Sequence, residues 1–208
     1  MQTAGSASAN GGIIRSVGLQ AQPTRRIVYT LLITGQYVMA NPTYPPMDDA
    51  QRSAVASALG AIPSGQYILT AAFEDRRLGA LVGWVQQCCF EPPMVSISIQ
   101  KGTPIMPLIS ESRAFALCQL GTADARLARK FGGQTDLGDD PFLGQPLIKP
   151  VISKLPIIAT SKSYMECELV CHMDVEGDHD IFVGSIRNAG YENPFEPMIH
   201  LREDGMQY

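Results

Sequence analysis

A candidate anion site lies where the segment Leu78–Gln100 ends. Lys101, Gly102, Thr103 and Pro104 follow this segment directly, and a helix is predicted to begin at Pro104. Unpaired backbone N–H groups and the helix dipole favour a phosphate at such a helix N-terminus. Lys101 adds a point charge and Thr103 adds a hydroxyl. The sequence therefore predicts a phosphorylated cofactor whose phosphate is held by Lys101, Thr103 and the start of the helix.

His179 is a second candidate for chemistry. It follows the turn Gly177-Asp178 and begins an apolar run that continues D-I-F-V-G-S-I. A histidine at the mouth of a strand is placed to meet a ligand at a barrel rim, but it can equally be a solvated turn residue hydrogen-bonded to Asp178. The residues alone leave both interpretations open.

The five cysteines give little support to a metal site or a reactive thiol. Cys167, Cys171 and His172 are close in sequence, but no second Cys/His pair at zinc spacing completes a tetrahedral site. Cys88 and Cys89 are adjacent, which strains a disulfide between them, and no cation flanks them in sequence to activate a thiol. We therefore expect no metal, and we expect this pair to pack against a ring system. An odd cysteine count in this layout favours a reducing cytoplasm.

Composition excludes several classes of function. The 208 residues suffice for one well-buried domain, and the net charge of -4 comes with no basic block. Binding to nucleic acid or to an anionic membrane through bulk electrostatics is therefore not expected. No apolar run approaches the ~20 residues that span a bilayer. No G-x-S-x-G, P-loop or G-x-G-x-x-G motif is present, so hydrolase, NTPase and Rossmann functions lose their main support.

The N-terminal part of the chain differs in composition from the rest. Its first 24 residues are rich in Ala, Gly, Ser and Gln, and a breaker cluster covers residues 41–46. A helix start follows at Met47-Asp48-Asp49, with Gly60 at the position of a C′ glycine. We therefore expect residues 1–46 to be disordered or an upstream extension, with Met47 as an alternative start, and residues 47–208 to form the domain.

Short strands dominate the sequence from Gln66 onward. Two helices are predicted among them, at Pro104–Arg113 with Thr103 as N-cap and at Thr122–Phe131 with Thr122 as N-cap. Many short strands with few helices predict a mainly β fold, a β-barrel with peripheral helices. The predicted strands are Tyr67–Phe73, Leu81–Gln87, Met94–Gln100, Ala114–Gln119, Ile157–Thr160, Tyr164–Val175, His179–Ala189 and Met198–Leu201.

Five segments in order resemble the flavin reductase-like, FMN-binding split-barrel family. The block 79–93 is similar to G-A-x-x-x-S-W-x-x-Q-x-S-F-x-P-P, and 177–184 is similar to G-D-H-x-x-x-x-G. The other three are 62–70, 127–131 and 199–208. The resemblance covers roughly residues 50–208. It is closest in character to the flavin reductase domain that is fused to flavodiiron proteins and rubredoxin-type carriers.

The chain departs from the family pattern at two places. Gly83 stands where many members have serine or alanine, and Cys88-Cys89 stand where Ala/Ser-Ser is common. A thiol donates weaker hydrogen bonds than a hydroxyl. The choice between FMN and FAD therefore stays open.

The resemblance implies an FMN-binding split β-barrel that forms a homodimer with one flavin at each subunit interface. It also implies an oxidoreductase of the NAD(P)H:flavin reductase type. NADH or NADPH would donate a hydride to flavin N5, and electrons would pass to a downstream acceptor, for example a partner protein. The alternatives are a non-enzymatic FMN-binding electron-transfer module without a nicotinamide site, and a barrel that uses another ligand or none.

The same resemblance gives roles to individual residues. Trp84 would form an apolar wall beside the isoalloxazine, although a lone strand tryptophan is often a core residue. Gln86 or Gln87 would reach the pyrimidine edge. His179, the predicted catalytic residue, would position the nicotinamide and tune the electrostatics at flavin N5 rather than act as an obligate acid or base. The predicted cofactor-binding residues are Val82, Gly83, Trp84, Val85, Gln86, Gln87, Cys88, Lys101 and Thr103.

Overall fold

The computed structural model describes residues 30–31, 37–38, 46–133, 140–152 and 154–206. The chain divides into two units, Met1–Pro42 and Thr43–Tyr208, and each is described by itself. In the first unit, β1 (Thr30–Leu31) pairs antiparallel with β2 (Tyr37–Val38). The prediction that residues 1–46 are disordered or an upstream extension lies almost wholly outside the described residues and stays a prediction.

The helix predicted after Met47 is present as α1 (Asp49–Gly60). A capping box closes its N-terminus: Gln51 N donates to Asp48 Oδ1 over 2.8 Å, and Asp48 N donates to Gln51 Oε1 over 3.2 Å. At the other end, Arg202 N donates to Gly60 O over 3.1 Å. The C-terminal segment is therefore bonded to the end of α1.

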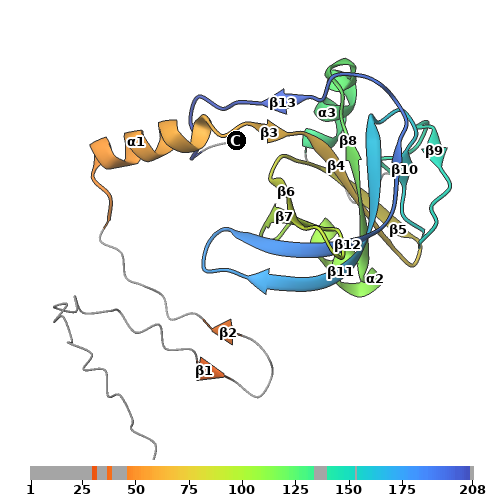
Figure 1. Cartoon of the computed structure of the whole chain (residues 1–208), viewed down its shortest axis with the longest axis horizontal. Helices are drawn as coiled ribbons and strands as arrows, with labels where there is room; N and C mark the ends of the chain where they lie inside the picture. The colour runs from red at the N-terminus through yellow and green to blue at the C-terminus, as the bar shows by residue number, and fades with distance from the viewer. Residues whose placement is uncertain (1–29, 32–36, 39–45, 134–139, 153, 207–208) are drawn as a thin grey trace, which may run out of the picture. The chain divides into compact units, whose positions relative to one another are not determined.

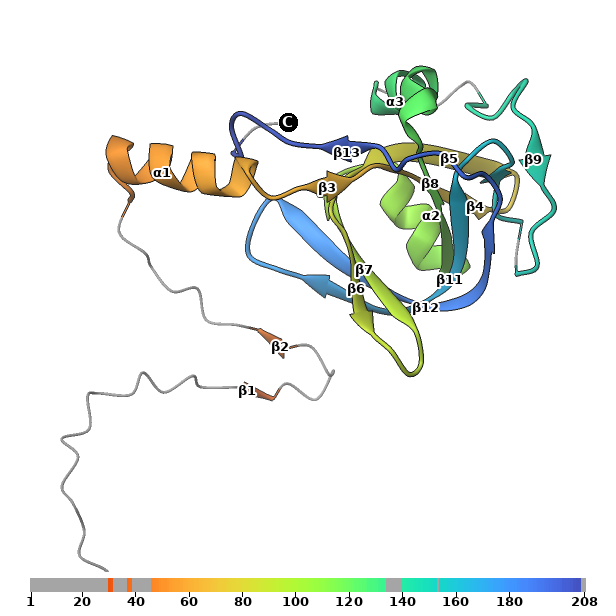
Figure 2. The ribbon, with the colours of Figure 1, turned by 45° about the horizontal axis from the view of Figure 1, so that its top comes forward.

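A seven-stranded antiparallel sheet forms the body of the second unit (Figure 1). Its spatial order is β5-β4-β8-β11-β12-β7-β6, so β5 and β6 are edge strands although they are consecutive in the chain. Figure 2 shows the sheet curled around α2 (Ile105–Ser112). This confirms the predicted mainly β barrel with peripheral helices. The strands are β4 (Tyr67–Phe73), β5 (Arg76–Val82), β6 (Val85–Cys89), β7 (Met94–Gln100), β8 (Ala114–Gln119), β11 (Ser163–Asp174) and β12 (His179–Tyr191).

Two short ladders accompany this sheet. β3 (Ser64–Gly65) pairs antiparallel with β13 (Ile199–His200), which carries the C-terminal segment along the start of β4. β9 (Leu147–Ile148) pairs antiparallel with β10 (Ile157–Ile158). The first ladder matters for function because it fixes the path of residues 199–202.

The predicted single strand Leu81–Gln87 is wrong, because the chain breaks at Gly83 and Trp84. β5 pairs with β4 on one side of the barrel, whereas β6 pairs with β7 on the other. The two linking residues therefore cross from one edge of the sheet to the other, and Trp84 O accepts from Ser98 N of β7 over 3.1 Å. Hydrophobic periodicity reports which face is buried and not which strand is the partner, so the pattern continues through the break.

Apolar side chains fill both faces of the central strands. Inside the barrel, Ile105, Leu108 and Ile109 of α2 pack among side chains from β4, β7, β8, β11 and β12. Outside, β4 and β8 are covered by α3 (Ala125–Gly132) and the segment after it, where the rings of Phe131 and Phe142 lie 5.4 Å apart. Because both faces are buried, β4 and β8 are near-continuous apolar runs, which made them easy to predict.

The two predicted N-caps, Thr103 and Thr122, are wrong. Pro104 precedes α2, and the Thr103 hydroxyl donates to Gln100 O instead of accepting from the helix. Thr122 lies inside a single 3₁₀ turn, η1 (Thr122–Asp124), that leads into α3. The turn is closed by Asp124, whose Oδ2 accepts from Gly121 N over 2.8 Å. A threonine signals that a helix is near, but terminal residues shift by one or two positions.

Candidate functional site

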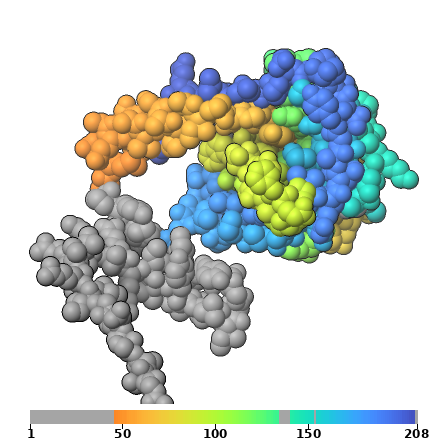
Figure 3. All heavy atoms as spheres, in the orientation of Figure 1, coloured from red at the N-terminus to blue at the C-terminus, as the bar shows by residue number. Residues whose placement is uncertain are grey.

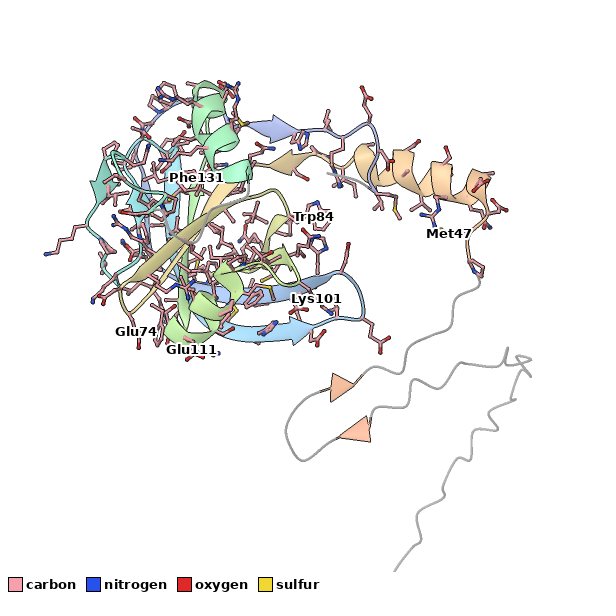
Figure 4. The ribbon with its side chains drawn as sticks, turned by 180° about the vertical axis from the view of Figure 1, so that it is seen from behind. Met47, Glu74, Trp84, Lys101, Glu111 and Phe131 are labelled. Atoms are coloured by element: carbon pink, nitrogen blue, oxygen red, sulfur yellow. The ribbon has the colours of Figure 1, made fainter. Side chains whose placement is uncertain are left out.

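A cleft of about 1200 Å³ opens where β5 and β7 end and α2 begins. Its remaining walls come from β3, from the glycines that follow Phe131, and from the C-terminal segment. Pockets for small ligands are typically ~300–1,000 Å³, so this cleft accommodates a mononucleotide-sized molecule. In Figure 4 the side chains of Trp84 and Lys101 lie on the same side of the barrel, away from Glu74 and Glu111.

Trp84 forms one wall of the cleft and is held between two partners. Its ring centroid lies 4.6 Å from that of His179, with 46° between the planes. The Arg202 guanidinium lies 5.3 Å from the indole centroid, within cation–π range. The sequence left two roles open for Trp84, a cofactor wall and a core residue. The half-buried side chain combines them, because it lines the cleft and packs against its neighbours.

His179 lies behind Trp84 and does not line the cleft. Its Nδ1 is 2.8 Å from Asp178 Oδ1, and this hydrogen bond lowers the pKa of Asp178. The predicted partner Asp178 is therefore present, but the imidazole is buried rather than solvated. Within this chain His179 packs against the Trp84 ring, and Trp84 in turn lines the cleft.

Lys101 lies on the rim of the cleft, yet its ammonium is engaged by the β11–β12 hairpin. Nζ donates to Asp174 Oδ1 over 2.7 Å and to Val175 O over 2.8 Å, and it lies 3.5 Å from Asp180 Oδ1. The hydrogen bond to Asp174 raises the pKa of Lys101 and lowers that of Asp174. The cation predicted to hold a phosphate is thus present at the cleft and already has carboxylate partners.

Thr103 and the first turn of α2 also line the cleft. Gly102 has a φ of 81°, which is in the left-handed region where glycine is favoured. A side chain at this position would point into open space. The turn thereby leaves open space at Gly102, while Thr103 N donates to Gln100 O over 3.2 Å and Met106 N donates to Thr103 O over 3.1 Å. This is the strand-to-helix junction on which the predicted phosphate site depends.

The structure separates the predicted cofactor segment into two parts. Val82, Gly83 and Trp84 line the cleft, whereas the four following residues leave it along β6. Gln86, Gln87 and Cys88 are exposed, and Cys88 lies at a bulge between the β6–β7 pairs of Gln87 and Cys89. Four of the predicted cofactor-binding residues therefore do not line the cleft of their own chain, namely Val85, Gln86, Gln87 and Cys88.

Several cleft residues were missed from the sequence. Ser64 and Ser98 contribute hydroxyls, and Arg202 contributes a second cation. His200 lies beside them on β13. All of these residues except Ser98 lie in segments of the family resemblance, but no local pattern connected positions 64, 98 and 200 to a shared site. The remaining missed positions are Gln66, Leu78, Gly79, Ala80, Leu81, Ile99, Gln100, Phe131, Gly132 and Gly133.

A sequence model of the flavin reductase like domain matches residues 59–207, which is most of the chain. The chain belongs to the flavin reductase-like family. This confirms the resemblance inferred from the five motifs, and with it the enzyme class, an oxidoreductase. The matched segment includes every residue predicted for the cofactor or for catalysis.

Relatives in this family include longer proteins. The diflavin flavoprotein A 3 of Nostoc sp. (strain PCC 7120) is 33% identical over 154 residues, which are 73% of this chain and 26% of that protein. The high molecular weight rubredoxin of Moorella thermoacetica is 30% identical over 69% of this chain and 62% of its own length. The chain thus spans about a quarter of the length of the diflavin flavoprotein it matches.

Solved structures show the same fold. The NADH:FAD oxidoreductase SgcE6 of Streptomyces globisporus superposes with a TM-score of 0.67 over 80% of this chain and 96% of that chain, at 23% identity. The flavin reductase PheA2 superposes with a TM-score of 0.62 over 74% of this chain and 94% of that chain, at 21% identity. At these identities the likeness is evidence for the fold, and it confirms the predicted split barrel.

The residues of the cleft fit a flavin mononucleotide. Leu78, Ala80, Val82 and Trp84 offer an apolar wall for a planar ring system. The hydroxyls of Ser64, Ser98 and Thr103 offer hydrogen bonds, and Lys101 offers a positive charge for a phosphate. Among the described residues, no cluster of three or more His, Cys, Asp or Glu side chains could hold a metal ion. No described helix is both long and apolar enough to cross a membrane.

Proposed function

We propose that the chain is an NAD(P)H-dependent flavin reductase that binds FMN in this cleft, with FAD as the alternative flavin. The observation that carries the proposal is the polarity of the cleft. An apolar wall ends at Trp84, whereas Lys101 and Thr103 form a polar end. A flavin mononucleotide has the same two parts, an aromatic ring system and a phosphate.

The residues of the chain would bind and orient the flavin. The ring would lie along β5 and Trp84, and the phosphate would lie at Lys101 and Thr103. When bound, the flavin supplies a hydride acceptor at N5. His179 and Arg202 flank the indole of Trp84, so they are positioning residues that fix the wall against which the flavin and nicotinamide rings are aligned.

We propose that the protein is a homodimer with flavin at the subunit interface. The β6–β7 hairpin, yellow-green on the face in Figure 3, carries Phe90 with 88% of its surface exposed. Gln86, Gln87 and Cys88 lie on the same hairpin, are exposed, and do not line the cleft of their own chain. Burial of this exposed surface on a second subunit would bring these residues to the partner's flavin.

The chemistry of the thiols supports a reducing cytoplasm as the place of action. All five cysteines are free. Burial raises the pKa of Cys118 to about 11 and that of Cys167 to about 12, so both remain protonated thiols within the core. Reduced flavin or its electrons would pass from the enzyme to a downstream acceptor in that compartment, for example a partner protein.

The proposal predicts that NADH or NADPH reduces FMN in the presence of this protein. The full chain is mixed with FMN under anaerobic conditions, either nicotinamide is added, and the loss of the visible absorbance band of oxidised flavin is followed. Catalysed bleaching is the expected result, and mixtures without protein give the background rate. Binding of FMN without bleaching by either nicotinamide would instead support an electron-transfer module.

A further inference from the structure

Three acceptors surround the Lys101 ammonium. An ammonium has three N–H donors, and the nearest acceptors are Asp174 Oδ1 at 2.7 Å, Val175 O at 2.8 Å and Asp180 Oδ1 at 3.5 Å. All three belong to the β11–β12 hairpin rather than to the cleft wall. Asp174 Oδ1 and Val175 O accept hydrogen bonds from this ammonium, so a phosphate in the cleft competes with them for Lys101.

The two carboxylates differ in how easily they can release the lysine. The Asp180 side chain is only 7% exposed, and its Oδ1 accepts no hydrogen bond from the part of the chain that the structure describes. Its other oxygen is 2.8 Å from His172 Nε2. The Asp174 side chain is 78% exposed, so water can solvate it when the ion pair opens. The ligand that is easiest to exchange is Asp174.

Lys101 also separates two like charges. Asp174 and Asp180 are directly opposite each other in the β11–β12 ladder. Like charges in this position destabilise a sheet pair, and the ammonium between them offsets that repulsion. A phosphate that draws Lys101 away from Asp174 restores part of it. The restored repulsion lowers the affinity for any ligand that draws Lys101 away from Asp174, and it does not affect a ligand that makes no contact with Lys101.

We propose that Asp174 is a specificity-determining residue that competes with the phosphate of the bound flavin for Lys101. The inference rests on the proposed function, because it requires a flavin phosphate at this end of the cleft. Asp174 would lower the affinity for FMN and leave the affinity for riboflavin, which has no phosphate, unchanged. The exposed carboxylate thus sets how strongly the protein holds phosphorylated flavin.

The test compares the dissociation constants of FMN and riboflavin for the full chain and for Asp174→Asn. Removing the competing charge is expected to tighten FMN binding by about two- to fivefold, the range set by an exposed ion pair. Riboflavin binding is expected to stay the same. The gain for FMN is expected to shrink at high salt, because added ions screen exposed charges.

Two further variants separate this mechanism from a general change of charge. Glu168→Gln makes the same charge change on the same strand, at an exposed residue that pairs with Arg187 over 2.7 Å and lies outside the cleft. It is expected to leave both affinities unchanged. In a Lys101→Ala background, Asp174→Asn is expected to give no gain, because the residue for which the carboxylate competes is absent.

The outcomes distinguish the inference from the function on which it rests. An equal shift for FMN and riboflavin, no shift for either, or a gain that persists without Lys101 would overturn the role of Asp174. Failure of the unaltered chain to bind either flavin would overturn the proposed function itself, and the inference with it. A gain restricted to FMN and dependent on Lys101 supports both.

Discussion

Replacing Glu166 with alanine is expected to lower the free energy of unfolding by about 2–4 kcal/mol. The Glu166 side chain is fully buried on β11. Its carboxylate accepts from Ile152 N over 2.9 Å, from Val151 N over 3.0 Å and from Asn188 Nδ2 over 2.6 Å. Alanine would leave these donors without their acceptor and open a cavity. Water can reach the exposed Val151, which limits the loss.

Glu168, two positions along the same strand, provides the matched control. Its carboxylate is exposed and pairs with the exposed Arg187. Glu168→Ala is therefore expected to cost less than about 1 kcal/mol. Urea unfolding of both variants, followed by circular dichroism, measures the difference. Equal losses would show that the buried carboxylate does not anchor the segment that contains Val151 and Ile152.

Replacing Lys101 with alanine is expected to weaken FMN binding by about ten- to a hundredfold. A hydrogen bond from a charged donor contributes about 1.5–3 kcal/mol, and each 1.4 kcal/mol is about tenfold in affinity. The loss falls on the phosphate contact, and riboflavin lacks that group.

Lys130→Ala serves as the control for this measurement. Lys130 is an exposed cation on α3 that does not line the cleft, so its removal makes the same charge change without removing a cleft residue. Equilibrium titration of FMN and riboflavin into the three proteins gives the comparison. Similar losses of FMN affinity in the Lys101 and Lys130 variants would show that net charge, rather than a phosphate contact, governs binding.

The sequence predicted the strands that local pattern determines. Tyr67–Phe73, Met94–Gln100 and Ala114–Gln119 were predicted with the bounds that the structure has. The order of apolar and polar side chains along each of these strands indicates whether one or both of its faces are buried. The break at Gly83 and Trp84 could not be read in this way, because it reflects a change of partner strand. That choice depends on how the whole sheet closes.

The parts of the site that are continuous in sequence could be predicted, whereas the contacts that depend on strand pairing could not. The junction from β7 through Lys101 and Thr103 into α2 is continuous in sequence, and it lines the cleft. Arg202 reaches Trp84 only because β13 pairs with β3. The contact of Asp174 with Lys101 depends likewise on the pairing of β12 with β7. Neither contact can be predicted from the spacing of these residues in the sequence.

The central claim is that flavin binds against Trp84 in the cleft between β5, β7 and α2. Because Trp84 is the only tryptophan of the chain, its emission reports on that wall alone. FMN is titrated into the full chain, with the same titration into free N-acetyltryptophanamide as the correction for absorbed light. The account predicts quenching of Trp84 that saturates together with the bound fraction of flavin from equilibrium dialysis. Saturable flavin binding with unchanged Trp84 emission would contradict it.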